Sequence, residues 1–444
     1  MIKYRALIFF LFSISLVGCS TNPAQYIGGL FPKANERAVR DMYVDKDEKI
    51  EEESSKEVEK SFFSYLIFWD TSENKRIINL DPGVIWSNDI GASQNFASSI
   101  LQPTYDNKNT IYTIDTDGFI TSTNIETGDE NWSYSLDIDV TSGLLIHNNH
   151  LFFGASDGVF YGYKIEHFNQ NIKYLDKLNV MNVFDKSDIQ PDMMIQLKSE
   201  AVSPAIGVDN LVYIKLSDGD TVAINYEKSF IEWTHQGRNI ALSIKGTAAI
   251  SYDYENVYVA RDDGNLISLS HDTGKLNWLV SISPKSGRNE LESLRDIEMS
   301  PLIKDGALYV GSYQGNLISV DIISGNIIWI TPISIHANLG IDDSNIYASS
   351  NDGIIYAIDR YNGDKVWQAQ FNQDTLFSQP TVLNNYIITF STNGDLIVLD
   401  KSNGNTVHFS ELLDEIDYQS NILLINKILY IVSKNGRLNA IKIN

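Results

Sequence analysis

Apolar and polar residues alternate in short runs along most of this chain, and glycine-containing turns separate the runs. Residues 307–329 show the unit: an apolar run over 307–312, a turn at 313–315, a second alternating run over 316–321 and a third run from 327. Period-2 runs joined by Asp-Gly or Asn-Gly are the strongest local signal for β-hairpins. The pattern therefore predicts successive antiparallel hairpins, and we find no helical 3.6-residue period of any length.

The hairpin unit recurs with one spacing: an aromatic residue, a glycine six positions later and a tryptophan fourteen after that. Five copies keep it: Tyr112, Gly118 and Trp132; Tyr213, Gly219 and Trp233; Tyr258, Gly264 and Trp278; Tyr309, Gly315 and Trp329; Tyr347, Gly353 and Trp367. A second glycine often lies ten positions after the first, and the first glycine recurs eight times. Units of about 40–50 residues with several strands each are typical of propeller blades. The sequence predicts an all-β fold: an eight-bladed β-propeller with four-stranded antiparallel blades.

The N-terminal end of the repeat array carries the half-unit that its C-terminal end lacks. The eighth unit stops at Asn444 without a Gly-x-x-x-Trp half, and residues 80–86 carry an isolated copy of that half. We expect the strand around Val84–Asn88 to complete the last blade, with Trp86 in the tryptophan position. Such closure by an N-terminal strand would remove the sheet edges of an open array.

The unit resembles the PQQ-type propeller repeat, whose motif is Ala-x-Asp-x-x-Thr-Gly-x-x-x-Trp; the best copies are Ser268–Trp278 and Ala357–Trp367. The resemblance covers roughly residues 77–444 and implies that the tryptophans dock neighbouring blades. The residues expected in this role are Trp86, Trp132, Trp233, Trp278, Trp329 and Trp367. Unit 2 has no tryptophan and is followed by an insertion around Asp176–Lys198, and unit 7 has His408 in the position. We expect those seams to pack differently.

The N-terminus predicts export. Lys3 and Arg5 precede an apolar run, residues 6–17, that is too short for a comfortable membrane span, so residues 1–18 are predicted to be a signal peptide. Leu16 to Cys19 (LVGC) resembles the bacterial lipobox, which implies cleavage before Cys19 and acylation of that cysteine. The alternative is an ordinary signal peptide with an incidental cysteine. Because Cys19 is the only cysteine, an intramolecular disulfide is excluded.

The segment between anchor and propeller divides in two. Residues 19–60 are predicted to be the lipid anchor and an acidic flexible tether, since 45–60 is dense in charge and lacks aromatic residues. Residues 61–76 form an apolar segment leading into the propeller at 77–444; its core, Phe62–Trp69, is either an extra strand or a partner-binding segment. Ser20 after the cysteine implies the outer membrane, with the propeller on the periplasmic face, because aspartate there marks inner-membrane retention in this class.

Charge and residue types favour a binding protein. The formal net charge of −23 disfavours nucleic acid as a partner. Seven scattered histidines and one cysteine form no catalytic or metal-ligating motif, so we predict no catalytic residue, no metal and no cofactor. Ser217–Asp220 is interpreted as a hairpin turn rather than a calcium loop, and the repeated Asp321, Asp359 and Asp400 as turn-forming residues.

Two irregular stretches carry a narrower resemblance. Asn239–Thr247 (NIALSIKGT) and Glu290–Pro301 (ELESLRDIEMSP) resemble the corresponding loops of the BamB family of outer-membrane protein assembly lipoproteins. In that family the loops dock the POTRA domains of the barrel subunit BamA. The resemblance implies partner contacts from Leu242, Ile244, Lys245, Asp296 and Glu298. Lysine replaces the family arginine and glutamate its final aspartate, and lysine cannot make the planar bidentate contact.

The alternative for the first loop is packing, because alternation would put Leu242 and Ile244 on the inward face of an innermost strand. The sequence as a whole predicts a non-catalytic scaffold lipoprotein of the β-barrel assembly machinery. Its partners would be a BamA-like subunit and possible unfolded outer-membrane protein clients, with membrane contact by the lipid anchor only. The alternatives are another periplasmic propeller scaffold and a PQQ-dependent dehydrogenase, whose paired-cysteine quinone site this chain lacks.

Overall fold

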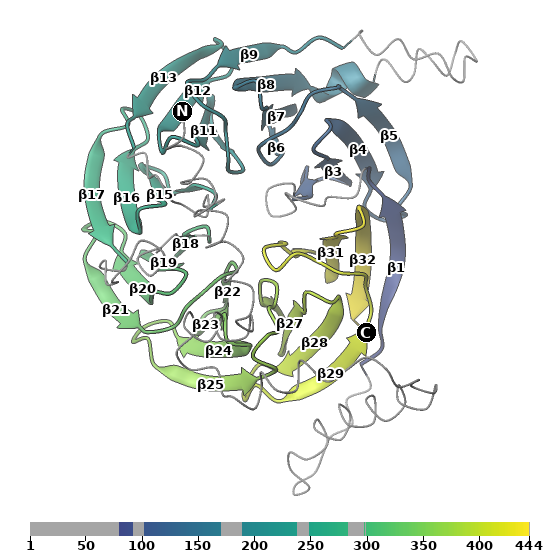
Figure 1. Cartoon of the computed structure of the whole chain (residues 1–444), viewed down its shortest axis with the longest axis vertical. Helices are drawn as coiled ribbons and strands as arrows, with labels where there is room; N and C mark the ends of the chain where they lie inside the picture. The colour runs from purple at the N-terminus through teal and green to yellow at the C-terminus, as the bar shows by residue number, and fades with distance from the viewer. Residues whose placement is uncertain are drawn as a thin grey trace, which may run out of the picture. The chain divides into compact units, whose positions relative to one another are not determined.

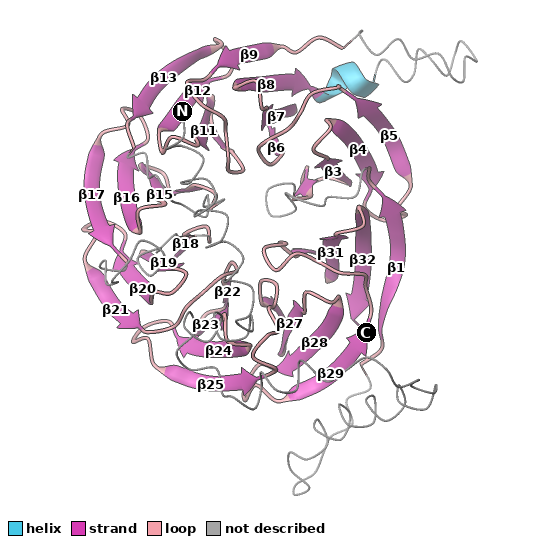
Figure 2. Cartoon of the chain, viewed as in Figure 1, coloured by secondary structure: helices cyan, strands magenta, loops and turns pink. Residues whose placement is uncertain are grey.

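The computed structural model describes residues 80–91, 102–169, 189–237, 248–282, 297 and 299–443, all within the unit Ile78–Asn444. These residues form eight four-stranded antiparallel sheets arranged as a ring (Figure 1). Figure 2 shows strands almost throughout, with one helical turn at 165–169. The predicted eight-bladed all-β propeller is confirmed.

Each blade runs from a short inner strand to a long outer strand on the circumference (Figure 1). Blades 1 to 4 contain, in that order, β2 (Thr104–Tyr105), β3 (Thr110–Ile114), β4 (Phe119–Asn124) and β5 (Glu130–Ser135); β6 (Leu145–His147), β7 (His150–Gly154), β8 (Val159–Lys164) and β9 (Met193–Gln196); β10 (Ile206–Val208), β11 (Leu211–Lys215), β12 (Thr221–Asn225) and β13 (Phe230–His235); β14 (Ser251–Tyr252), β15 (Asn256–Ala260), β16 (Asn265–Ser270) and β17 (Leu276–Ser281).

Blades 5 to 8 repeat the order. They contain β18 (Leu302–Lys304), β19 (Ala307–Gly311), β20 (Leu317–Asp321) and β21 (Ile327–Thr331); β22 (Gly340–Ile341), β23 (Asn345–Ser349), β24 (Ile354–Asp359) and β25 (Lys365–Gln370); β26 (Thr381–Leu383), β27 (Tyr386–Phe390), β28 (Asp395–Asp400) and β29 (Thr406–Glu411); β30 (Leu423–Ile425), β31 (Ile428–Ser433), β32 (Arg437–Ile443) and β1 (Pro82–Asp89).

The last blade is closed by the N-terminal strand. β1 pairs antiparallel with β32, and the register places Trp86 opposite Ala440. Asn439 is also bonded to β1, because its Oδ1 accepts from Ser87 Oγ at 2.8 Å. The predicted ring closure, with Trp86 in the tryptophan position, is confirmed.

The aromatic-to-tryptophan spacing has a packing cause. The second strand of a blade carries the aromatic residue and the outer strand the tryptophan; in blade 5, Tyr309 and Trp329 lie opposite the same residue of β20, Ser319. Their ring centroids are 6.0 Å apart, and Tyr309 is fully buried. The spacing therefore brings two large rings together on one face of the blade, where aromatic pairs add to the burial energy.

Blade 2 differs from its prediction. The insertion was expected after unit 2, around Asp176–Lys198, but Met193–Gln196 form β9, the outer strand of that blade. The insertion therefore interrupts the blade between β8 and β9. The register pairs Met193 with Gly162, as tryptophans pair elsewhere, so buried Met193 occupies the tryptophan position.

The repeated aspartates form turns, as predicted. Asp321 Oδ1 accepts from Ser324 N, Asp359 Oδ1 from Tyr361 N and Asp400 Oδ1 from Ser402 N, each at 2.8 Å. A carboxylate that bonds the backbone two or three residues onward stabilises this kind of turn.

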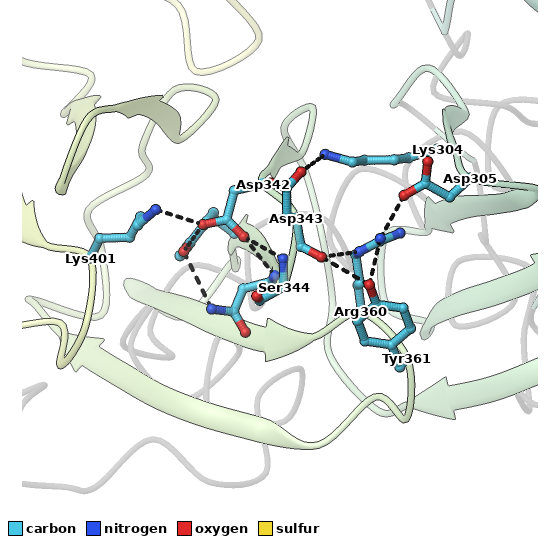
Figure 3. Close-up of polar contacts among 10 residues, drawn as sticks. Lys304, Asp305, Asp342, Asp343, Ser344, Arg360, Tyr361 and Lys401 are labelled. Carbon is cyan, nitrogen blue, oxygen red and sulfur yellow. Dashed lines mark hydrogen bonds and ion pairs between the residues drawn. The ribbon is translucent and has the colours of Figure 1, made fainter.

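A polar network joins the turns of blades 5, 6 and 7 (Figure 3). The buried guanidinium of Arg360 bonds Asp305 of blade 5 (2.6 Å) and the carbonyl of Asp343 (2.6 Å). Lys304 pairs with Asp343 at 2.8 Å, and Lys401 of blade 7 pairs with Asp342 at 3.0 Å. The Arg360–Asp305, Lys304–Asp343 and Lys401–Asp342 contacts each cross a blade boundary, so the network ties neighbouring turns together.

Asp342 makes this network sensitive to acid. Burial alone would raise the pKa of Asp342, but bonds from Asn345 N, Ser344 N, Lys401 and Tyr347 lower it to about 2. Since the pKa of an unfolded aspartate is about 3.9, the stabilisation is complete above about pH 4 and is lost as pH falls to about 2. We expect Asp342→Asn to lower the thermal unfolding midpoint at pH 7 and to approach the wild type towards pH 2.

The measurement is a series of thermal unfolding curves from pH 7 to pH 2. The exposed Asp374→Asn serves as the control and should follow the wild type throughout. A constant difference between Asp342→Asn and wild type at all pH values would contradict the assignment.

Candidate functional site

The predicted docking residues belong to two blade-to-blade connections. Residues 238–247 join β13 to β14, and residues 283–296 with 298 join β17 to β18. Leu242, Ile244, Lys245, Asp296 and Glu298 therefore lie outside the described residues, as does Cys19. Because the strands of a blade alternate in direction, connections from an outer strand to the next inner strand all leave the ring on one face. The described residues at the ends of these connections form the frame of the candidate site.

The two connections are tied to each other where they re-enter the ring. Ala249 N, just after the first connection, donates to Ser300 Oγ at 3.0 Å, and Ser251 Oγ bonds the carbonyl of Pro301. Ser300 N in turn donates to Asn338 Oδ1 of blade 6 at 2.8 Å. The exits of both connections are thus held at a fixed separation beside blade 4.

The second stretch is only partly available to a partner. Ile297 and Met299 are 0% and 1% exposed and pack in a core cluster with Ile282 and Ile335. Gly311 N donates to Met299 Sδ at 3.0 Å. Ile297 lies between the predicted contacts Asp296 and Glu298, so the stretch is anchored through its centre. The period-2 apolar pair Ile297 and Met299 was the sequence signal for this anchoring.

A buried ion pair crosses the seam between blades 3 and 4 on the same face. Lys215, at the end of β11, has a side chain only 2% exposed, and its Nζ lies 3.0 Å from Asp262 Oδ1 in the β15–β16 turn. Nζ also donates to the carbonyl of Ala260 at 3.4 Å. A buried charge needs such a partner. Sequence reasoning missed this pair, although a lysine closing the apolar run LVYIK was a visible signal.

A second cluster of ion pairs lies at the start of the first connection. Lys198 Nζ lies 2.9 Å from Asp218 Oδ2 and 3.1 Å from Asp220 Oδ2, and Gly237 N donates to Asp220 Oδ1 at 2.8 Å. Burial would raise the pKa of Asp218, but bonds with Lys198, the backbone N of Asp220 and Ser199 lower it below its usual value. Asp218 and Asp220 lie in the β11–β12 hairpin, which agrees with the turn interpretation of Ser217–Asp220.

Comparison with known proteins shows which family this frame resembles. The family model described as outer membrane protein assembly factor BamB matches residues 181–369, which include both connections. The chain is 23% identical over 370 residues to the outer membrane protein assembly factor BamB of Yersinia pestis, covering 81% of this chain and 88% of that protein. The crystal structure of BamB from Moraxella catarrhalis has a TM-score of 0.68 and 18% identity, and covers 82% of this chain and 100% of that chain. The chain is similar to the BamB family over residues 181–369 and shares the propeller fold.

The fold itself is shared more widely than the family. A quinohemoprotein alcohol dehydrogenase from Comamonas testosteroni matches with a TM-score of 0.60 at 10% identity, over 81% of this chain and 76% of that chain. That likeness concerns the propeller fold alone. Among the described residues, no helix is long and apolar enough to span a bilayer.

Five tryptophans of the ring contact the next blade in the same way. A Cβ on Gly325 of blade 5 would lie 2.6 Å from Trp278 Cδ2 of blade 4, so the indole occupies space that only glycine leaves free. The glycine also has φ +70°. The same pairing holds for Trp86 with Gly128, Trp233 with Gly274, Trp329 with Gly363 and Trp367 with Gly404. Each of these five indoles donates from Nε1 to a carbonyl of the next blade, at 2.8–3.3 Å.

The seams after blades 1 and 2 lack this tryptophan–glycine pairing, and each packs in a different way. Trp132 has no turn glycine opposite it; its ring stacks on Phe168 of the helical turn at 4.8 Å, and Nε1 donates to Asn169 Oδ1 at 2.9 Å. Where Met193 replaces tryptophan, the next blade has Ser229 (φ 55°) at the glycine position. The docking role of the tryptophans stays a prediction that these contacts support.

Proposed function

We propose that this BamB-like chain is a non-catalytic scaffold of the outer-membrane β-barrel assembly machinery that assists insertion of outer-membrane proteins. The observation that carries the proposal is the family match over residues 181–369, which spans both connections and their frame. The relatives are named outer membrane protein assembly factors, which supports a role in assembly rather than in oxidation. An alternative as a quinone-dependent dehydrogenase has only the shared fold behind it.

In this proposal the partner is the POTRA region of a BamA-like barrel subunit. Leu242 and Ile244 supply apolar contacts, Lys245 a basic contact, and Asp296 and Glu298 acidic contacts. The frame supports the proposal, because the Ala249–Ser300 bond and buried Ile297 fix described residues at the ends of the two connections. Fixing these ends before binding lowers the conformational entropy lost on association.

Attachment to the outer membrane through acylated Cys19, on the periplasmic face, completes the proposal. Two components held on one membrane meet at a raised effective concentration, so a modest interface suffices. The tether of residues 19–60 would set how far the ring reaches from its anchor.

The test is capture of a BamA-like subunit from detergent-solubilised membranes. We expect Leu242→Ala combined with Lys245→Glu to abolish capture while thermal unfolding stays within about 2 °C of the wild type, as for surface changes. The matched control is Leu424→Ala combined with Lys442→Glu, two exposed residues of blade 8.

A wild-type chain that captures no subunit with POTRA domains would refute the proposal. A large loss of stability in the Leu242→Ala, Lys245→Glu variant would instead favour the packing alternative for this loop. For the dehydrogenase alternative, titration with pyrroloquinoline quinone should give neither an absorbance change nor activity.

A further inference from the structure

One repeated position, two residues before the inner strand of each blade, lies on the face that carries the two predicted docking connections. The inner strands surround the axis of the ring (Figure 1), so the residues at this position lie near the axis. In blades 1 to 8 they are Gln102, Gly143, Pro204, Ala249, Ser300, Asn338, Gln379 and Asn421. Amides occur only in blades 1, 6, 7 and 8, which are consecutive in the closed ring.

Hydrogen bonds join five of these residues into a chain. Ala249 N donates to Ser300 Oγ at 3.0 Å, and Ser300 N donates to Asn338 Oδ1 at 2.8 Å. Asn338 Nδ2 donates to Asn421 Oδ1 at 2.5 Å, and Asn421 Nδ2 donates to Gln102 Oε1. We refer to these five residues as the amide ladder. The ladder leads from the ends of both docking connections, in blades 4 and 5, to the two blades that meet at the ring closure.

Asn338 is the central member of the ladder because it uses both halves of its amide. The oxygen accepts from the connection that enters blade 5, and the nitrogen donates to blade 8, so the ladder bypasses blade 7. A side chain that only accepts or only donates could not make both bonds. Gln379, at the same position of blade 7, donates instead to the carbonyl of Leu339 at 3.1 Å.

A buried histidine holds Asn338 in place. His336, in the same connection, is 3% exposed, and its Nε2 lies 3.0 Å from the carbonyl oxygen of Phe377 in the connection that enters blade 7. Its ring also packs against Tyr418 of the connection that enters blade 8, with centroids 5.3 Å apart. The connections that enter blades 6, 7 and 8 are therefore joined to one another, and Asn338 joins them to Ser300.

We propose that Asn338 is a positioning residue for partner docking, which fixes the ends of both docking connections against the joined connections of blades 6 to 8. The inference rests on the proposed function. Ser300 follows the predicted contact Glu298 by two positions, and Ala249 follows Lys245 by four. An interface that uses both connections forms with a smaller loss of conformational entropy when their separation is fixed before binding.

The first test is hydrogen exchange of the full chain, measured by mass spectrometry on peptides that contain Ala249 or Ser300. Asn338→Leu removes both bonds at similar side-chain volume, and Asn338→Asp keeps an oxygen that accepts from Ser300. We expect Asn338→Leu to speed exchange at least about fivefold in both peptides, and Asn338→Asp to stay within about twofold of the wild type. The matched control, Gln379→Leu, should also behave like the wild type. Wild-type exchange in Asn338→Leu would overturn the proposal.

The second test is binding of a purified, detergent-solubilised barrel subunit that carries POTRA domains. We expect Asn338→Leu to raise the Kd at least about fivefold, and Asn338→Asp and Gln379→Leu to bind like the wild type. Faster exchange with unchanged binding would overturn the positioning role, as would equal weakening by Gln379→Leu. A wild type that binds no such subunit refutes the proposed function, whereas the exchange result still reports whether the ladder holds the connections.

Thermal unfolding separates positioning from a general contribution to stability. Each variant should unfold within about 4 °C of the wild type, because one or two hydrogen bonds are lost from a large ring. A larger loss in Asn338→Leu with wild-type exchange at Ala249 and Ser300 would assign the ladder to stability alone and overturn the proposal.

A further variant covers misfolding of Asn338→Leu. Asn421→Ala breaks the next bond of the ladder and leaves the bond between Ser300 and Asn338 in place. It should speed exchange in the same two peptides and weaken subunit binding, each by a smaller factor. Wild-type exchange and binding in Asn421→Ala would contradict a ladder that acts as one unit.

Discussion

Replacing Trp329 by alanine is expected to lower the free energy of unfolding by about 3–5 kcal/mol, the usual cost of truncating a buried tryptophan. The ring is 7% exposed and packs on Tyr309 in its own blade and on Gly363 in the next. Its Nε1 donates to the carbonyl of Arg360 at 2.9 Å. The substitution would remove aromatic contacts on both sides of the seam and leave that buried carbonyl without this donor. Denaturant unfolding followed by circular dichroism measures the change.

His408→Ala is the matched control, because His408 holds the tryptophan position of blade 7. His408 is half-buried, and its ring bonds Ser410 of its own strand rather than the next blade. We expect this variant to lose no more than about 1 kcal/mol, the range of a single modest hydrogen bond. Equal losses from His408→Ala and Trp329→Ala would show that the indole has no special part in joining blades.

Asp262→Ala is expected to cost about 3–5 kcal/mol, because it leaves the Lys215 ammonium buried without its carboxylate. Lys215 is 2% exposed, and the second oxygen near its Nζ is the Ala260 carbonyl at 3.4 Å. Adding Lys215→Met to Asp262→Ala should recover most of the loss, since the buried charge is then gone. Denaturant unfolding of both single variants and the double variant gives the coupling energy directly.

The control for this cycle is Asp272→Ala, whose side chain is 77% exposed beside His271. Its effect should lie within about 0.5 kcal/mol, as for ordinary surface changes. If the double variant were no more stable than Asp262→Ala alone, the loss would come from the turn rather than from the buried lysine.

The blades were predictable because their signals are local. A turn glycine with positive φ, an alternating run and a tyrosine opposite a tryptophan lie within about 20 residues, and each is visible as a spacing. Ring closure was predictable for a different reason: the unit containing Trp86 lacked the hairpin that the last unit still needed. The prediction for blade 2 was wrong because the insertion separated β9 from β8 and no tryptophan marked the strand.

The contacts that form the frame of the candidate site were harder to predict from the sequence. Lys215 and Asp262 are 47 positions apart and meet only because blades 3 and 4 are neighbours in the ring. The bond between Ala249 and Ser300 likewise joins residues 51 positions apart.

By itself the sequence determined the number of blades, their turns, the strand that closes the ring and the resemblance of two connections to the BamB family. All of these are written in spacings and short motifs, because hairpins and turns are local structures. Only the tertiary structure decided which charges pair across seams and which residues of the second connection are buried. Those features depend on contacts between blades, and a contact between blades joins residues that the chain itself keeps far apart.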